Sequence, residues 1–141
     1  MTIAQKQLQS ARLIHIAFVI AAVIYAGIPF LINPANPRPV APVIVFAFGL
    51  VALSTWAAGF FIRSRMVMPA AEALRNHPED ASAAARWRSG VVLSLTLCES
   101  VLLFGFALKM IGASWNVCVI FYVVGFFFLL AWTPRLELPA A

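Results

Sequence analysis

Four apolar segments, each about 20 residues long, occupy most of this 141-residue chain. They comprise residues 11–32, 39–62, 89–111 and 113–133. An α-helix rises about 1.5 Å per residue, so each segment is long enough to cross the hydrocarbon core of a bilayer, about 30 Å thick. The pattern predicts an all-α fold, an integral membrane four-helix bundle that forms one transmembrane domain over residues 1–141.

Composition excludes the main alternative, a water-soluble domain. Hydrophobic residues make up 63% of the chain and charged residues 11%, and the mean hydropathy is +0.95. A chain of this length cannot bury so much apolar surface in one core. The connections between the segments are too short to form a separate domain, so we expect no enzymatic activity.

The basic residues are distributed unevenly along the chain. Eight lie on the side that carries both termini and the connection 63–88, and two lie on the other side. The eight are Lys6, Arg12, Arg63, Arg65, Arg75, Arg86, Arg88 and Arg135, and the two are Arg38 and Lys109. By the positive-inside rule, both termini and the connection 63–88 are expected in the cytoplasm. The net charge of +5 is therefore a topology signal, and we expect no nucleic-acid partner.

The connections predict that the bundle is made of two transmembrane hairpins. Segment 33–38, Asn-Pro-Ala-Asn-Pro-Arg, cannot continue a helix. Gly112 marks an even shorter turn between the third and fourth segments. Within the cytoplasmic connection, prolines in helix-starting positions predict a short helix over 69–75 and a second helix beginning near Pro78, which continues into the third segment.

Glu99 lies near the middle of the third segment and is the one acidic residue within the four apolar segments. An ionisable group at this depth costs about 2.5–3.5 kcal/mol on insertion scales, so such residues usually face a bundle interior, a partner or an ion path. Desolvation favours the neutral acid, and no basic residue lies at the same depth to oppose this. Glu99 is therefore the main candidate for a buried polar or ion-binding site.

Depth along the helices suggests partners for Glu99. Tyr122 in the fourth segment lies at the same level, and Thr96 lies one turn before Glu99 on almost the same face. Ser54 and Thr55 lie about one turn nearer the cytoplasm. We expect a protonated Glu99 that is hydrogen-bonded to Tyr122 and holds the hairpins together. A titrating proton or cation site, and a contact with another subunit or with lipid, remain open alternatives.

The other chemically distinctive residues predict packing. His15 lies near the cytoplasmic boundary and is expected to cap a neighbouring group or to extend to the interface, with a haem or chlorophyll ligand as the alternative. Cys98 and Cys118 differ too much in depth to form a disulfide, so we expect two free, buried thiols. Ser94, Cys98 and Gly105 form a small-residue stripe suited to close helix packing. Metal-site and phosphate-binding spacings are absent, so we expect no metal and no cofactor.

Residues 97–106, Leu-Cys-Glu-Ser-Val-Leu-Leu-Phe-Gly-Phe, resemble the ion-binding helix of V-type ATPase proteolipid subunits, in which an acid is followed six residues later by a glycine after an aromatic residue. This resemblance implies that Glu99 is the carboxylate that carries a proton or a sodium ion. The same run, followed by a tight turn, a last helix and Thr133-Pro134-Arg135, resembles a class of small uncharacterised bacterial four-helix membrane proteins. The second resemblance supports the topology, implies a bacterial cytoplasmic (inner) membrane and implies no activity.

Together these features predict a non-enzymatic accessory or scaffold subunit of a membrane complex. Its expected partners are the lipid bilayer and either other membrane subunits or further copies of itself. The alternative is a proteolipid-like subunit that translocates protons or cations through Glu99. A dry, hydrogen-bonded carboxyl would favour the scaffold, and an aqueous path to Glu99 would favour conduction.

Overall fold

The computed structural model describes residues 2–31 and 39–136, and within them all regular structure is helical. The elements are α1 (Ile3–Leu31), α2 (Pro42–Ile62), the π-helical turn η1 (Arg63–Val67), α3 (Met68–Asn76), α4 (Ala81–Met110) and α5 (Trp115–Ala131). Three continuous helices, Ile3–Leu31, Pro42–Asn76 and Ala81–Met110, are long and apolar enough to cross a membrane, and α5 is a shorter apolar helix. The all-α prediction is confirmed. The predicted loop 33–38 lies outside the described residues.

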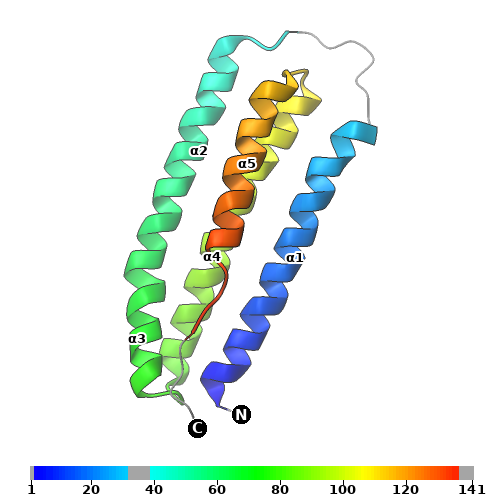
Figure 1. Cartoon of the computed structure of the whole chain (residues 1–141). Coiled ribbons are helices and arrows are strands. Elements are labelled where there is room, and N and C mark those ends of the chain that lie inside the picture. The colour runs from blue at the N-terminus through cyan, green and yellow to red at the C-terminus, as the bar shows by residue number, and fades with distance from the viewer. Residues whose placement is uncertain (1, 32–38, 137–141) are drawn as a thin grey trace.

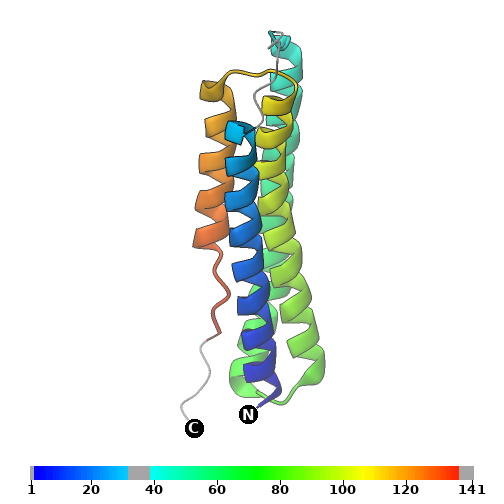
Figure 2. The same cartoon turned by 90° about the vertical axis from the view of Figure 1, so that its right-hand side faces the viewer.

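α4 is the central helix, and α1, α2 and α5 each pack against it. Figure 1 shows α1 and α2 on opposite sides of α4, and Figure 2 shows α5 along another side. α4 and α5 form one antiparallel hairpin, as predicted. α1 and α2 do not pack against each other along their described lengths, so the expected second hairpin is not a packed pair. The reason is that both helices find their closest contacts on α4 instead.

α1 begins at Ile3, eight residues before the apolar segment that predicted it. The polar first turns remain helical because Thr2 and Gln5 form a capping box. The backbone N–H of Gln5 donates to Thr2 Oγ1 over 3.2 Å, and the backbone N–H of Thr2 donates to Gln5 Oε1 over 2.8 Å. The apolar pattern located the span, and these caps determine where the helix starts.

The first turn of α1 is also tied to the connection that precedes α4. The backbone N–H of Ala4 donates to the carbonyl of Pro78 over 3.1 Å. The N–H of Ile3 donates to the Glu79 carboxylate over 3.4 Å. These bonds satisfy N–H groups that have no partner within the helix. They also fix the beginning of α1 beside the beginning of α4, so that the two helices run parallel (Figure 1).

α2 continues without interruption through η1 into α3. The predicted helix over 69–75 is therefore present within α3, but it extends α2 and is not a separate piece. Pro69 has no N–H, and its ring would clash with the carbonyl four residues earlier in a regular α-helix. The wider turn relieves this conflict, and the N–H of Met68 donates to the carbonyl of Arg63, five residues earlier.

α4 begins at Ala81, directly after the Pro78-Glu79 turn, and continues to Met110. The prediction that the second cytoplasmic helix runs into the third apolar segment is confirmed. Asp80 caps the helix, because its Oδ1 accepts from the backbone N–H groups of Ser82 and Ala83 over 2.9 and 3.0 Å. A cap at this position makes α4 start well before residue 89, where the apolar segment begins.

The turn between α4 and α5 lies at Gly112, as the sequence predicts. Gly112 has a φ of 103°, in the left-handed region that favours glycine. The N–H of Ala113 donates to the carbonyl of Leu108, and the N–H of Gly112 donates to that of Lys109. This pair of bonds is a Schellman motif, and it reverses the chain within a few residues.

Close packing against α4 depends on small residues. The predicted stripe of Ser94, Cys98 and Gly105 is buried. A Cβ added at Gly105 would lie 3.0 Å from the Cβ of Phe121, and a Cβ added at Gly125 of α5 would lie 2.6 Å from Leu102 Cγ. The α4 and α5 backbones approach so closely only because both positions are glycine.

Candidate functional site

Three sides of α4 are covered by other helices, and one side is open. α5 lies against Gly105, α2 places Phe48 5.6 Å from Phe104 between ring centroids, and α1 places Tyr25 6.1 Å from Phe106. Figure 2 shows α5 on one side of α4 and no helix on the opposite side within the described residues. This remaining side is the open face of α4, which consists of Leu93, Thr96, Ser100 and Leu103.

Glu99 borders this open face and does not lie in the bundle interior. Successive residues of an α-helix are about 100° apart, so Glu99 is rotated away from the buried Cys98 beside it. Its side chain is half-buried. Among the described residues, no hydrogen bond or ion pair involves its carboxyl group. The most distinctive polar group of the apolar segments is therefore unpaired at the edge of an uncovered helix surface.

The expected hydrogen bond between Glu99 and Tyr122 is not formed. The Tyr122 hydroxyl donates to the backbone carbonyl of Tyr25 in α1 over 3.3 Å. Tyr122 lies on α5, which covers the opposite side of α4 from the open face. The depth estimate placed Glu99 and Tyr122 at one level, but Tyr122 packs beside Gly105, six residues and so about 9 Å along α4 from Glu99. Tyr122 thus joins α5 to α1 and forms no hydrogen bond with Glu99.

The hydroxyl groups predicted to surround Glu99 bond to their own helices. Thr96 donates to the carbonyl of Val92 over 3.0 Å. Ser54 and Thr55 in α2 donate to carbonyls four residues earlier, over 2.9 and 2.8 Å. Such local bonds satisfy a hydroxyl in an apolar environment without a partner helix. Of the candidate residues, only Tyr122 makes a hydrogen bond between helices, and the predicted polar cluster is not assembled.

His15 fulfils the capping role that its position near the boundary suggested. Its Nε2 lies 2.8 Å from the backbone carbonyl oxygen of Leu129, and the side chain is buried. Because a carbonyl can only accept, Nε2 carries the proton in this bond. Leu129 lies in the last turn of α5, where carbonyl groups lack partners within the helix. His15 therefore joins α1 to the end of α5.

Two buried polar atoms lack a hydrogen-bond partner in the described part of the chain, namely Gln7 Oε1 and Trp87 Nε1. Trp87 is fully buried in α4, and Gln7 lies in α1 beside Arg88 at the same end of the bundle. Neither group was identified from the sequence, because hydropathy does not indicate which polar atoms lack a partner. Trp87 Nε1 is a hydrogen-bond donor, and Gln7 Oε1 is an acceptor.

The described residues contain no cluster of side chains suited to a metal ion. No three His, Cys, Asp or Glu side chains among residues 2–31 and 39–136 come close enough together to hold a metal ion. Cys98 and Cys118 are free and buried, as predicted. Buried thiols of this kind act as small apolar side chains in packing.

Cationic side chains gather at the α3 end of the molecule and meet aromatic rings there. Arg63 lies 5.2 Å from the centroid of the Trp132 ring, and Arg65 lies 5.6 Å from that of Phe61. At the other end, Lys109 lies 4.8 Å from the ring of Trp115. Guanidinium and ammonium groups are attracted to the faces of such rings. Both ends of the bundle thus combine positive charge with aromatic groups, a composition that suits the interface between lipid and water.

Comparison with known proteins adds no relative. A scan against protein-family models, a search of curated proteins and a search of solved structures each find no match to this chain. The functional interpretation therefore depends on two features of the chain itself: the unpaired Glu99 carboxyl and the open face of α4 that it borders.

Proposed function

We propose that the protein is a multi-pass protein of a bacterial cytoplasmic membrane, with four crossings and with both termini and the connection 63–88 in the cytoplasm. Three helices of sufficient length and apolar character support the crossings. α5 has 17 residues, which at about 1.5 Å per residue gives about 25 Å. The concentration of basic residues around the α3 end supports the orientation.

The exposed surface of the helices supports this environment as well. Large apolar side chains point outward along α1, α2 and α5, and examples are Leu13, Phe46 and Val123 with exposed fractions of 69%, 67% and 61%. A lipid environment accommodates such side chains at no cost, whereas water does not. Helices also satisfy their own backbone hydrogen bonds, which lipid cannot do.

Within the membrane, the protein acts as a non-enzymatic accessory subunit that binds a transmembrane helix of another subunit through the open face of α4. The observation that carries this proposal is the unpaired, half-buried Glu99 at the edge of the open face. A carboxyl group left facing lipid is unfavourable even when it is protonated. A polar group on a partner helix restores a hydrogen bond, which contributes about 0.6–2 kcal/mol between helices in membranes.

Site-specific photo-crosslinking in cell membranes tests this proposal. A photoreactive side chain at Leu103, on the open face, is expected to give one adduct of discrete mass. The same side chain at Val43 of α2, which is 70% exposed and lies far from the open face, is the matched control and is expected to give only lipid adducts. An adduct of twice the chain mass would identify the partner as a second copy.

Two substitutions connect the adduct to Glu99. Glu99→Gln keeps the shape and the hydrogen-bonding capacity, so the Leu103 adduct is expected to persist. Glu99→Ala removes them, and the adduct is expected to weaken several-fold. Equal adducts from Leu103 and Val43, or an adduct unchanged in Glu99→Ala, would contradict the proposal.

The same unpaired carboxyl favours a second function, in which Glu99 carries a proton or cation as the resemblance to proteolipid subunits implies. A flux measurement in reconstituted vesicles separates the two functions. The accessory role predicts equal flux in the presence and absence of the protein. Proton or sodium flux that requires the protein and is lost in Glu99→Gln, with the crosslink intact, would establish conduction in place of the accessory role.

A further inference from the structure

An apolar groove runs between α2 and α5, on a different side of the molecule from the open face of α4. It has a volume of about 390 Å³. Its lining comes from α2, α5 and one residue of α4: Gly49, Ala52, Leu53, Trp56, Val101, Ile120, Phe121, Val124 and Phe128. The groove exists because α2 and α5 both pack on α4 and because α2 contributes small residues to this face. A Cβ added at Gly49 would meet no atom within 4 Å.

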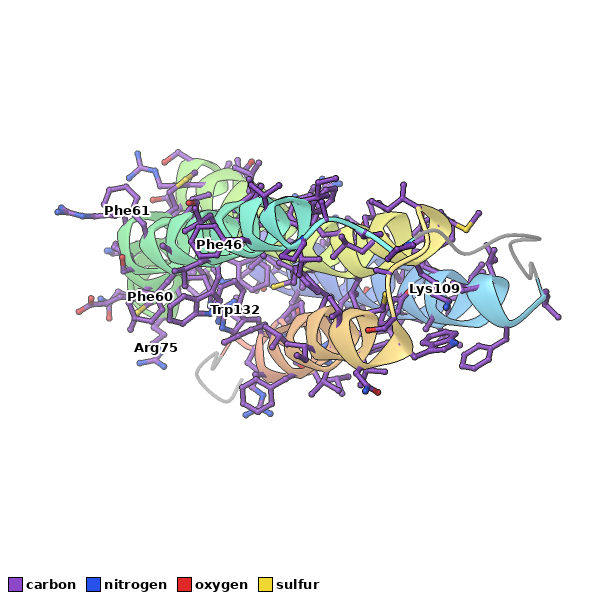
Figure 3. The ribbon with its side chains drawn as sticks, turned by 90° about the horizontal axis from the view of Figure 1, so that it is seen from above. Phe46, Phe60, Phe61, Arg75, Lys109 and Trp132 are labelled. Atoms are coloured by element: carbon purple, nitrogen blue, oxygen red, sulfur yellow. The ribbon has the colours of Figure 1, made fainter. Side chains whose placement is uncertain are left out.

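Aromatic residues close the groove toward the α3 end. The rings of Trp56 and Phe128 lie 5.4 Å apart between centroids, and those of Phe128 and Trp132 lie 5.6 Å apart. At this level α2 and α5 come into contact, since a Cβ at Gly59 would lie 2.8 Å from the Trp132 ring. Figure 3 shows Trp132 between α2 and the end of α5, and Lys109 toward the opposite end.

Arg63 lies directly beyond this aromatic end. Its guanidinium group is held over the Trp132 ring, and the side chain is half-buried. Arg63 follows Trp56 by seven residues, so it projects from the same face of the helix, about 10 Å further along the axis. No carboxylate in the described residues forms an ion pair with Arg63. A fixed guanidinium without an anion therefore lies at the end of a groove lined only by apolar and aromatic side chains.

We infer that this groove binds an anionic phospholipid of the cytoplasmic leaflet. One acyl chain lies over the aromatic end and in the groove between α2 and α5, and the phosphate accepts hydrogen bonds from Arg63. An acyl chain matches the apolar lining, and an anionic headgroup complements the unpaired charge. This inference is independent of the partner on α4, although it uses the same membrane orientation.

Lipid retention tests the groove. The protein is reconstituted in vesicles containing equal amounts of phosphatidylglycerol and phosphatidylcholine, extracted in mild detergent, and examined by native mass spectrometry. The wild-type protein is expected to retain one phosphatidylglycerol in preference to phosphatidylcholine. Gly49→Leu fills the groove and is expected to lose the retained lipid. Gly27→Leu on α1, where an added Cβ also meets no atom within 4 Å, is the matched control and is expected to retain it.

The headgroup contact has its own pair of variants. Arg63→Gln is expected to lower the preference for phosphatidylglycerol about fivefold, the factor that corresponds to about 1 kcal/mol per basic residue near an anionic surface. Arg65→Gln removes a neighbouring charge that lies over Phe61, about 200° around the helix from Arg63, and is expected to keep the preference. Circular dichroism and elution as one species show that each variant is folded.

Three results would overturn the inference. The first is equal retention of the two lipids by the wild-type protein. The second is equal lipid loss in Gly49→Leu and Gly27→Leu, which would show that the groove is not the binding site. The third is an equal effect of Arg63→Gln and Arg65→Gln, which would indicate general attraction to an anionic surface. Glycerol phosphate has the phosphate of the headgroup but no acyl chain. It is expected not to displace the retained lipid, because binding also requires an acyl chain in the groove.

Discussion

α2 and α4 are both long, apolar helices, yet they occupy opposite positions in the packing of the molecule. Of the most apolar stretch of α4, 44% is buried, against 6% of that of α2 with its continuation. α4 packs against α1, α2 and α5 and buries large residues such as Leu102 as well as Gly90 and Gly105, whereas Gly59 is the one buried residue of α2. The difference therefore lies in the number of neighbouring helices, and the glycines of α4 allow the close approach.

The largest expected effect comes from filling a glycine on each of these two helices. Gly105→Leu places side-chain atoms against the Cβ of Phe121 and the backbone carbonyl of Cys118, neither of which can move easily. We expect it to lower the free energy of unfolding by about 2–3 kcal/mol. Gly49→Leu on α2 enters open space and is expected to change it by less than about 0.5 kcal/mol. Unfolding in mixed micelles with increasing dodecyl sulfate, followed by tryptophan fluorescence, measures both.

Similar losses from Gly105→Leu and Gly49→Leu would break the comparison between α4 and α2. They would mean that the face of α2 at Gly49 is covered by protein in the native state. A loss of stability restricted to Gly105→Leu would sharpen the comparison, because the same added side chain would then destabilise the protein on α4 and leave its stability unchanged on α2.

A smaller effect is expected at the ends of the helices. α2 continues into α3, so its last carbonyls are used within the helix, whereas the end of α5 depends on His15. His15→Ala is expected to lower the free energy of unfolding by about 1 kcal/mol, the usual contribution of one hydrogen bond. Ser54→Ala on α2 removes a bond within one helix and is the control.

Hydrogen exchange shows whether the loss in His15→Ala is local. Faster exchange in residues 130–136 of His15→Ala, with no change in Ser54→Ala, is the expected result. If the two variants lose equal stability, the bond from α1 to α5 is no more important than a local serine bond.

The smallest expected effect is a change of helix-end stability with pH. It compares the start of α4, which Asp80 caps, with the start of α2, which has no side-chain cap. Hydrogen bonds from the backbone N–H of Ala83 and from the Ser82 side chain hold the pKa of Asp80 below its ordinary value. The stabilisation is therefore fully present above the ordinary pKa of an aspartate and is lost as the pH falls through the lowered value. Asp80→Asn keeps a cap at every pH and is expected to remove this dependence.

Exchange of the Ser82 and Ala83 amides between about pH 5 and pH 2, compared in wild type and Asp80→Asn, measures the effect. α2 starts at Pro42 with no side-chain cap, so exchange in its first turn is expected to show no such difference between the proteins. A wild-type protein that behaves as Asp80→Asn over this range would exclude the ionised cap.

The sequence predicted the apolar helices and the turn at Gly112, because each depends on local residue types, and it predicted the free cysteines from their different depths along two helices. It did not predict that α1 begins at Ile3 or that α3 extends α2, since a polar cap and a π-helical turn decide those bounds. It also did not predict that α1 packs on α4 and not on α2. In chains this apolar, many faces are compatible with lipid, and hydropathy does not select among them.

The expected hydrogen bond from Glu99 to Tyr122 failed in both depth and rotation. Tyr122 packs at the level of Gly105, six residues along α4 from Glu99, and a hydrogen bond also requires two side chains to point toward each other. The small-residue stripe through Cys98 contained the missing signal. If that stripe faces the interior, the next residue along the helix must point about 100° away from it, and Glu99 is that residue.

The parallel contact between α1 and α4 has a consequence for biogenesis. Among the described residues of the first half of the chain, α1 and α2 form no packed interface, so a ribosome that has made these two helices has released no packed unit. α1 can dock only after α4 has been synthesised, and its first N–H groups find their acceptors only when Pro78 and Glu79 are present.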